Sequence, residues 1–356
     1  MIKKSELCIL HIGTEKTGST TIQENFHKTV SDPRANYPDL GGVNHNVHLF
    51  GLFLKNPHKL YYFVNNNFSE IEIENFRKET KTKLEKYFLD PDKSITILSA
   101  EALATSTLAE IQEMKAYLST FFQKVLVIVY IRPTQSFCNS AFQQRVKYHN
   151  LSTIEFNLVL RNKNIDNYVK VYGADSVKII PFLPFRFPQN DIMIDFCRQS
   201  GLKEQISSIK QSNESLSKEA VSILFTYNYH QNVHSDFKNQ NFQIQNILVE
   251  KIRAIGTEKF LLSGKLVANW VTTHFEDDYH WTLNQVLPEE RKYFTIDTSI
   301  QGISTPMELM MYATQYIDEL VTLIGTPEIP FVLEKTPQTV AKLVDFLKKQ
   351  IQSELK

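Results

Sequence analysis

The chain has 356 residues, which is enough for one large domain or two smaller domains with a substantial core. Its 39 basic and 39 acidic side chains balance, so no overall field attracts nucleic acid or an anionic membrane, and any basic site must be local. Three scattered cysteines argue against a disulfide framework or a zinc cluster, and the lack of a signal sequence or long apolar run predicts a cytoplasmic protein without a membrane span.

A strand, a glycine-bounded loop and a helix are expected in succession near the N-terminus. Residues 8–12 predict a buried strand, Gly13 and Gly18 bound the loop, and a helix is predicted over 19–30. Such a loop directs several backbone N–H groups and a helix N-terminus at one spot, which favours a phosphate-like anion. The spacing of the glycines is that of a Walker A loop, but the lysine, Lys16, lies inside the loop instead of following Gly18.

The next segment is a predicted loop, punctuated by prolines and glycines, that contains His45 and His48. Two histidines three positions apart can share a helix face, so a catalytic or metal-binding role is one interpretation. The edge of a polar loop is the more frequent setting for such a pair. No third ligand is evident nearby, so no metal site is expected here.

A charged amphipathic helix over 69–88 precedes a second buried strand, predicted over 94–101. This strand ends in polar residues, the last of which is Glu101. In open α/β sheets the ligand crevice lies at the carboxyl ends of the strands, so Glu101 is a candidate for chemistry. The alternative is that Glu101 is a first-turn acid of the following helix.

A helix over 107–122 leads to a nearly continuous apolar run over 124–131, which predicts a central parallel strand covered on both faces. The strand ends at Arg132, and Pro133 can open the next helix, which would carry Ser140 about two turns in. A Walker B strand normally ends in an acid that holds magnesium. The cation at this position therefore argues against nucleoside triphosphate chemistry.

The later part of the chain predicts one more strand over 177–181 and a helix over 192–201 that ends at a glycine. From residue 215 onwards only helical periodicity is evident. The expected helices there are 217–233, 243–256, 266–278, 307–323 and 338–355.

Two of these motifs resemble those of the sulfotransferases that use 3′-phosphoadenosine 5′-phosphosulfate (PAPS). Residues 16–21 resemble their 5′-phosphosulfate loop, and Arg132 followed eight residues later by Ser140 resembles their 3′-phosphate motif. The resemblance covers roughly the first 200 residues and points to bacterial members without a membrane anchor. It implies a P-loop-type α/β fold, a three-layer sandwich around a mostly parallel sheet, with residues 1–205 as the PAPS-binding core and an all-helical region, 206–356, covering the acceptor side.

The resemblance also implies an activity, the transfer of a sulfuryl group from PAPS to a hydroxyl acceptor without a metal. The 5′-phosphate would be held by Lys16, Thr17, Gly18, Ser19, Thr20 and Thr21. Lys16 would neutralise charge on the bridging oxygen, and Arg132 with Ser140 would bind the 3′-phosphate. The acceptor must lose a proton, and the candidate bases are Glu101 first and then His45 or His48.

Several alternatives stay open at this stage. Glu101 could be a surrogate for the Walker B acid of a P-loop kinase, or the chain could be a non-catalytic nucleotide-binding or scaffold module. The acceptor is not named by the sequence, but the aromatic residues Trp270 and Trp281, with nearby histidines, favour a saccharide or polysaccharide precursor. The adenine contacts, a third nucleotide-binding segment and the oligomeric state have no sequence assignment.

Overall fold

The computed structural model describes residues 3–154, 160, 162–208, 215–231, 242–325 and 329–355. The chain divides into two compact units, and each is built from separate stretches of sequence. The first contains Met1–Pro133, Leu160–Ser212 and Asp277–Phe294, and the second contains Thr134–Val159, Asn213–Glu276 and Thr295–Lys356. This division follows contacts rather than sequence order, whereas a single boundary at residue 205 is expected from the sequence. The roles assigned to 1–205 and 206–356 stay a prediction.

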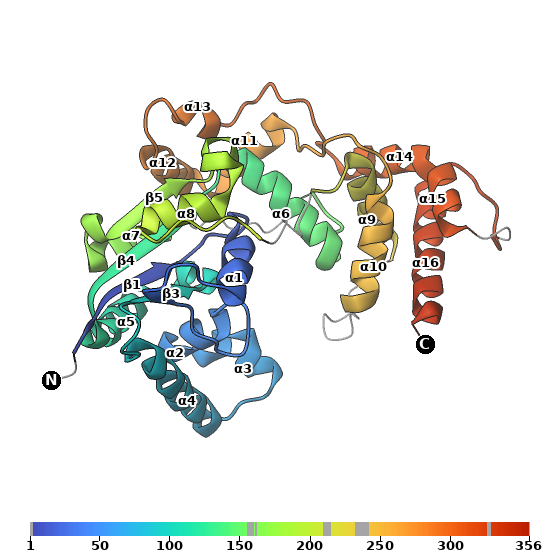
Figure 1. Ribbon diagram of the computed structural model, residues 1–356. Coiled ribbons are helices and arrows are strands. Elements are labelled where there is room, and N and C mark those ends of the chain that lie inside the picture. Colours follow the sequence, from blue (N-terminus) through green and yellow to red (C-terminus); the bar gives the residue numbers. More distant parts are fainter. Residues whose placement is uncertain are drawn as a thin grey trace. The chain divides into compact units, whose positions relative to one another are not determined.

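The first unit is organised around a five-stranded sheet in which every strand pair is parallel (Figure 1). The spatial order is β2-β3-β1-β4-β5, so β1 lies in the middle. The bounds are β1 Ser5–His11, β2 Ala35–Asn36, β3 Ile95–Ser99, β4 Phe122–Ile131 and β5 Val177–Pro181. The register pairs Leu10 of β1 with Leu98 of β3 and with Val127 of β4. The predicted α/β class with a mostly parallel sheet is confirmed.

The two faces of this sheet carry separate hydrophobic cores, because successive side chains of a strand point to opposite sides. Leu10 belongs to the core that also contains residues of α4 (Glu70–Phe88), α5 (Leu108–Phe121) and α7 (Ile165–Tyr172). Ile9 belongs to the other core, with residues of α1 (Ser19–Lys28) and α8 (Ile192–Ser200). Helices on both faces make the predicted three-layer sandwich.

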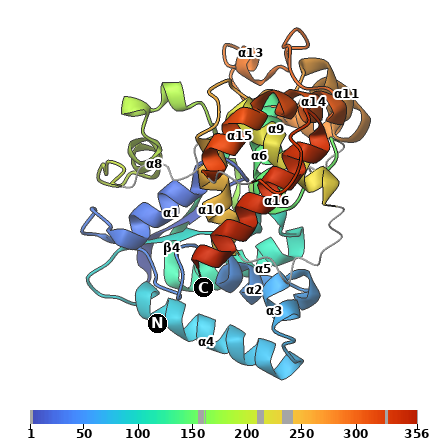
Figure 2. The ribbon, with the colours of Figure 1, turned by 90° about the vertical axis from the view of Figure 1, so that its right-hand side faces the viewer.

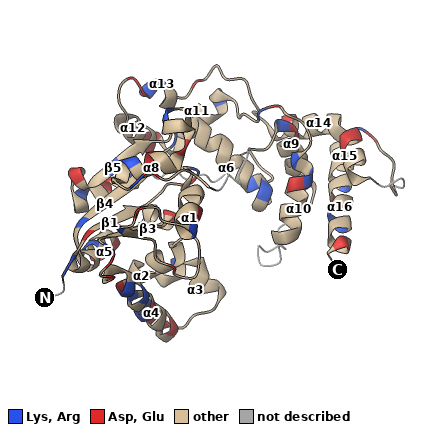
Figure 3. Cartoon of the chain, viewed as in Figure 1, with Lys and Arg blue, Asp and Glu red and all other residues tan. Residues whose placement is uncertain are grey.

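Local sequence signals set the starts of the two long helices before β3 and β4. Ser69 and Glu72 form a capping box at the start of α4, and Thr107 and Glu110 form another at the start of α5. Basic and acidic residues both occur along α4 (Figure 3), and most of them are exposed, as expected for a solvated face. The capping boxes explain why these helices begin within one residue of the predicted positions.

Other local features of the first unit differ from expectation. Apart from β2, the predicted loop is irregular up to His45, which is the N-cap residue of a π-helical turn over Asn46–Phe50, and this turn continues into α2, Gly51–Phe53. Strand β3 ends at Ser99, and Glu101 begins a 3₁₀-helix over Glu101–Thr105. The remaining elements of this unit are α3 Tyr61–Asn65, α12 Glu276–Asn284, α13 Arg291–Phe294 and short 3₁₀ turns at Pro57–Lys59, Asn162–Asn164, Ala174–Ser176, Pro184–Arg186 and Pro188–Asn190.

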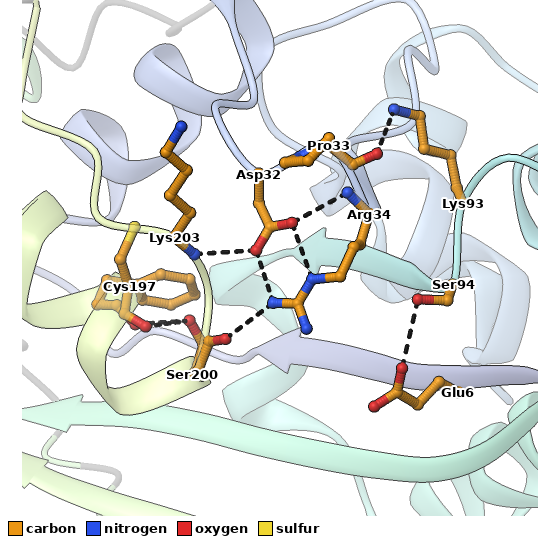
Figure 4. Close-up of polar contacts among 11 residues, drawn as sticks. Glu6, Asp32, Pro33, Arg34, Lys93, Ser94, Cys197, Ser200 and Lys203 are labelled. Atoms are coloured by element: carbon orange, nitrogen blue, oxygen red, sulfur yellow. Dashed lines mark hydrogen bonds and ion pairs between the residues drawn. The ribbon is translucent and has the colours of Figure 1, made fainter.

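A charged contact holds the edge of the sheet near β2 (Figure 4). Arg34 makes a bidentate pair with Asp32, at 3.1 Å from Nε to Oδ1 and 2.8 Å from Nη2 to Oδ2, and also donates to the carbonyl of Gly201 after α8. The backbone N–H of Lys203 donates to the same carboxylate. The hydrogen bond from Arg34 is the largest of the effects that hold the pKa of Asp32 well below its usual range. Two segments far apart in sequence are thereby joined beside β2.

Among the described residues of the second unit, the regular secondary structure is helical, apart from two isolated β-bridges, and loops connect the helices. Its elements are α6 Thr134–Tyr148, α9 Lys218–His230, α10 Phe242–Arg253, α11 Gly264–His274, α14 Pro306–Ala313, a 3₁₀ turn Thr314–Tyr316, α15 Ile317–Ile324 and α16 Pro337–Glu354. Helices α9, α14, α15 and α16 pack together (Figure 2).

Three helices of this half of the chain have bounds that differ from the predicted ones or cannot be compared with them in full. The single helix expected over 307–323 is divided into α14 and α15 by the 3₁₀ turn, and the helix expected over 266–278 ends at His274. The end of the helix expected over 217–233 lies outside the described residues. Over the parts of the chain that the structure describes, no helix combines the length and apolar character needed to cross a membrane.

Candidate active site

The loop between β1 and α1 has the backbone geometry of an anion-binding turn. Gly18 is the N-cap residue of α1 and has a left-handed backbone with φ of 76°. The positive φ favours glycine here, and a Cβ atom at this position would lie 2.7 Å from Cδ1 of Ile192, so the end of that side chain would have to move. No side chain caps the N-terminus of α1. The first N–H groups of the helix are therefore directed at the loop, where they favour a negative charge.

Lys16 occupies a second left-handed position in the loop, with φ of 66°, which is costly for a residue with a Cβ atom. Its carbonyl oxygen accepts a hydrogen bond of 2.7 Å from Nη1 of Arg132, the residue that follows β4. Thr17 Oγ1 donates to the carbonyl of Thr14 at 2.6 Å, and Thr14 Oγ1 donates to the carbonyl of Tyr130 at 2.8 Å. The loop is thus closed on itself and fastened to the end of β4.

Four charged side chains influence one another at this edge of the sheet. Burial lowers the pKa of Lys16, and the nearby charge of Arg132 lowers it further, whereas the carboxylates of Glu101 and Glu15 act in the opposite direction. Burial lowers the pKa of Arg132 to about 10, so its guanidinium stays charged at neutral pH. The guanidinium carbon also lies 5.5 Å from the centre of the Phe182 ring. Lys16 and Arg132, two predicted site cations from different segments of the chain, therefore lie close together.

The carboxylate of Glu101 lies beside the loop, as expected from its position after β3. Burial raises the pKa of this partly buried side chain, and the negative charge of Glu15 raises it further. The hydroxyl of Ser19 and the ammonium group of Lys16 lower it. A carboxylate with a raised pKa is suited to accepting a proton near neutral pH. The predicted pair of Lys16 and Glu101 is therefore brought together.

Ser19 differs from the other hydroxyl residues predicted to bind the 5′-phosphate. Its Oγ atom is buried and forms no hydrogen bond of normal geometry within the protein, although it is close enough to Glu101 to lower that pKa. Thr17 has already donated its hydroxyl proton inside the loop. Thr20 is exposed and Thr21 is buried. An unpaired buried hydroxyl at the first turn of a helix is what a bound anion would satisfy.

Sequence reasoning overlooked His11, the last residue of β1. The ring is fully buried, its Nδ1 lies 2.8 Å from Oγ of Ser99, and its Nε2 has no hydrogen-bond partner. A Cβ atom at Gly13 would lie 3.1 Å from this Nε2 and 2.3 Å from Oγ of Ser19. Burial lowers the pKa of His11 to about 3, so the ring is neutral. The signal in the sequence was that His11 is a polar residue in the otherwise apolar predicted strand 8–12, close to the carboxyl end where ligands bind.

The two histidines considered as bases have structural contacts of their own. His45 is fully buried, and both ring nitrogens contact the backbone, Nδ1 with the N–H of Ser99 at 3.2 Å and Nε2 with the carbonyl of Pro38 at 2.8 Å. Burial is the main reason that the pKa of His45 falls to about 4. The ring of His48 stacks on Phe76 of α4 with 5.3 Å between ring centres. Both ring nitrogens of His45 are thus engaged by the backbone, whereas Glu101 interacts with Lys16, so Glu101 is the base that the geometry favours.

The other predicted contacts involve residues of the second unit or have structural partners. Ser140 lies within α6, as expected, but α6 belongs to the second unit, so its pairing with Arg132 stays a prediction. Trp281 donates from Nε1 to Oδ1 of Asp166 at 2.6 Å, and Trp270 lies on α11 in the second unit. In the ranges that the structure describes, no group of three or more His, Cys, Asp or Glu side chains could hold a metal ion.

Comparisons with known proteins give low-level similarity only. No protein-family model and no curated protein matches the chain. A sulfotransferase structure from Alicyclobacillus acidocaldarius aligns at 13% identity and a TM-score of 0.37, covering 66% of this chain and 98% of that one. A sulfotransferase domain from the curacin biosynthetic pathway aligns at 12% identity and a TM-score of 0.34, covering 100% of this chain and 98% of that one. Alignments at this level carry no argument about activity, so function is argued from the residues themselves.

Proposed function

We propose that this protein transfers a sulfuryl group from PAPS to the hydroxyl of an acceptor. The observation that carries the proposal is the grouping of Lys16, Glu101 and Arg132 around the N-terminus of α1. The first belongs to the loop after β1, and the others follow the two strands that flank β1. A sheet edge with two cations, one carboxylate and uncapped helix N–H groups is suited to an anionic donor and a proton transfer.

The residues of the loop fit the phosphosulfate end of such a donor. PAPS supplies an activated sulfuryl group, and its 5′-phosphate would be held by the N–H groups of the first turn of α1 and by the buried hydroxyl of Ser19. Arg132 would contribute a charge-assisted contact to the 3′-phosphate, together with Ser140. Because Gly13 and Gly18 have no side chains, the backbone of the loop can lie close to Ser19 and Ile192.

Lys16 and Glu101 would act on the leaving group and on the acceptor, respectively. The ammonium group of Lys16 neutralises charge that develops on the bridging oxygen as the bond from sulfur to that oxygen breaks. Glu101 takes up the proton that the acceptor hydroxyl loses as its oxygen bonds to sulfur. Both effects are strengthened because the two side chains are shielded from bulk water, where charges interact weakly.

A ligand-binding experiment tests this proposal directly. Thermal unfolding should be measured with adenosine 3′,5′-bisphosphate and, separately, with ATP and magnesium. Adenosine 3′,5′-bisphosphate at about 100 times its dissociation constant should stabilise the protein by roughly 2.7 kcal/mol. Labelled PAPS with a panel of hydroxylated acceptors then identifies the product. Stabilisation by magnesium and ATP alone would overturn the proposal.

One observation favours a second candidate, a P-loop kinase. Ser19 and Glu101 lie close together, and in P-loop enzymes a hydroxyl of the loop and an acid on a nearby strand together hold magnesium. Against this, Lys16 precedes Gly18, and the strand beside β1 ends in Arg132. The two nucleotides of the unfolding experiment distinguish the candidates.

The acceptor that we propose is a saccharide or a polysaccharide precursor, modified in the cytoplasm. The proposal rests on the aromatic residues of the C-terminal half of the chain. Mono- and oligosaccharides, phenols and lipid alcohols in the acceptor panel provide the test. If only phenols or lipid alcohols accept the sulfuryl group, the proposal of a saccharide acceptor is wrong, but the proposal of sulfuryl transfer stands.

A further inference from the structure

Two neighbouring residues hold the backbone on both sides of Glu101. The N–H of His45 donates to the carbonyl of Ser99 at 3.0 Å, and the N–H of Ser99 donates to Nδ1 of His45 at 3.2 Å. On the other side of Glu101, the N–H of Ala102 donates to Oδ1 of Asn46 at 3.0 Å. The chain segment that carries the carboxylate is therefore fixed before and after it by one short stretch.

The ring of His45 is held in a single orientation and tautomer. Because Nδ1 accepts the N–H of Ser99, the ring proton must be on Nε2, which donates to the carbonyl of Pro38 at 2.8 Å. One face of the ring stacks on Tyr37, with 4.3 Å between ring centres. Burial keeps the pKa of His45 at about 4, so this neutral tautomer persists at neutral pH.

Asn46 supplies a helix cap that the local sequence lacks. The 3₁₀-helix that begins at Glu101 has Ala100 as its N-cap residue, and an alanine side chain cannot accept a hydrogen bond. The side chain of Asn46 provides this acceptor for the N–H of Ala102 from a segment 56 residues away. Its own N–H donates to Oδ1 of Asn44 at 3.1 Å, which fixes the direction of the stretch.

We propose that His45 and Asn46 are positioning residues that hold the carboxylate of Glu101 against Lys16 for proton transfer. This inference rests on the proposed function. We call these two residues the His45–Asn46 clamp. The clamp acts on the backbone, since its hydrogen bonds are with the main chain of Ser99 and Ala102 rather than with the carboxylate. Only Ala100 separates the end of β3 from Glu101, so a shift of the backbone at Ser99 or Ala102 moves the carboxylate. A misplacement of about 1 Å at a reacting group can cost roughly 10²-fold in rate.

Asn46 is the better position for a test, because His45 is fully buried and its replacement threatens the fold. Asn46→Ala should lower kcat by roughly 10- to 100-fold while adenosine 3′,5′-bisphosphate binds within about twofold of wild type. Asn46→Asp keeps an acceptor for the N–H of Ala102 and should retain most of kcat. Asn56→Ala is the matched control, since Asn56 caps another 3₁₀-helix through the N–H of His58 at 3.1 Å.

A double-mutant cycle separates positioning from a general loss of structure. If Asn46 acts through Glu101, then Asn46→Ala should cost nothing further in kcat when Glu101 is already glutamine. An equal loss in both backgrounds, or an unchanged kcat in Asn46→Ala alone, overturns the proposal.

A titration of Glu101 by carboxyl NMR keeps the clamp testable without any assay of transfer. In Asn46→Ala the pKa of Glu101 should move from its raised value toward the ordinary range, because a displaced carboxylate gains water. Asn56→Ala should leave it unchanged. If the pKa of Glu101 shifts in Asn46→Ala but the wild type transfers no sulfuryl group, the proposed function is refuted and the clamp is kept, whereas an unchanged pKa in Asn46→Ala refutes the clamp.

Discussion

Two glutamates, one in each unit, have opposite surroundings. Glu219 of the second unit is buried and accepts from the N–H of Glu258 at 3.2 Å and from the hydroxyl of Tyr316 at 3.4 Å, while Tyr312 donates to the carboxylate of Glu258 at 2.6 Å. Glu101 has one hydroxyl and one ammonium group nearby, with the carboxylate of Glu15 opposing them. The first glutamate is surrounded by donors, as buried structural carboxylates are. The second has a carboxylate that can still accept a proton.

A lysine in each unit repeats the contrast. Nζ of Lys218 lies 2.9 Å from the carboxylate of Glu258 and 4.0 Å from the centre of the Tyr312 ring. Lys16 instead has charges of both signs nearby: burial and then the cation Arg132 lower its pKa, whereas the carboxylates of Glu101 and Glu15 raise it. Cations that repel each other destabilise the folded protein unless an anion binds between them. The ion pair of Lys218 therefore indicates a structural role in the second unit, whereas two cations at one edge of the sheet favour an anionic ligand in the first.

The strongest test of this contrast exchanges each glutamate for glutamine. Glu101→Gln keeps the shape of the side chain but cannot accept a proton, so kcat should fall by roughly 10² to 10⁴-fold with normal binding of adenosine 3′,5′-bisphosphate. Glu219→Gln should leave kcat unchanged and lower the free energy of unfolding by about 1–3 kcal/mol, since donors would lose a charged acceptor. Steady-state kinetics and urea unfolding measure the two effects.

The pH dependence of the wild type adds a second outcome. Glu101 must be deprotonated to act, and its pKa is raised, so kcat should decline as the pH falls through that raised pKa. Glu101→Gln should remove this acidic limb from the residual activity. If Glu101→Gln keeps both its rate and its acidic limb while His45→Ala or His48→Ala is inactive, the base is a histidine.

The lysine exchange is expected to have the next largest effect. Lys16→Ala should lower kcat by roughly 10² to 10³-fold and donor affinity much less, because the charge on the bridging oxygen exists fully only in the transition state. Lys218→Ala should change stability alone, by about 0.5–1 kcal/mol. Equal losses of affinity and rate in Lys16→Ala would make Lys16 a binding residue only.

Arg132→Ala should weaken nucleotide binding by about one to two decades, as expected for charge-assisted hydrogen bonds worth roughly 1.5–3 kcal/mol. Part of the loss should extend to nucleotides without a 3′-phosphate, because Arg132 also donates to the carbonyl of Lys16. Calorimetry with adenosine 3′,5′-bisphosphate and adenosine 5′-monophosphate separates the two parts. Arg253→Ala, which removes an exposed pair with Glu250 in the second unit, is the control. A mutant that discriminates as well as wild type places the 3′-phosphate elsewhere.

The sequence predicted those features of the fold that depend on local pattern. Continuous apolar runs marked β1, β3, β4 and β5, because central parallel strands are covered on both faces. Polar residues directly after such runs had to gather at one edge of the sheet. This rule was enough to bring Glu101, Arg132 and Lys16 to the same place before any contact was known.

Features that depend on distant partners could not be predicted in this way. His45 sits in a polar stretch, and its role depends on Ser99, which is 54 residues away in the sequence. Strand β2 contains two residues and exists only because β3 pairs with it. Residues Asp277–Phe294 belong to the first unit although the residues before and after them belong to the second. No local sequence pattern indicates this assignment. His11 was overlooked because its apolar neighbours marked the strand as core.

The smallest expected effect concerns Ser140, the predicted donor-binding residue that the second unit supplies. A neutral hydroxyl contact contributes about 0.5–1.5 kcal/mol, so Ser140→Ala should weaken adenosine 3′,5′-bisphosphate by roughly 2- to 10-fold. Affinity for adenosine 5′-monophosphate should not change. Ser222→Ala removes a buried hydroxyl of α9 that has no hydrogen-bond partner and should change neither affinity. If Ser140→Ala weakens both nucleotides equally, or neither, Ser140 does not bind the 3′-phosphate, and among these residues donor binding falls to the first unit alone.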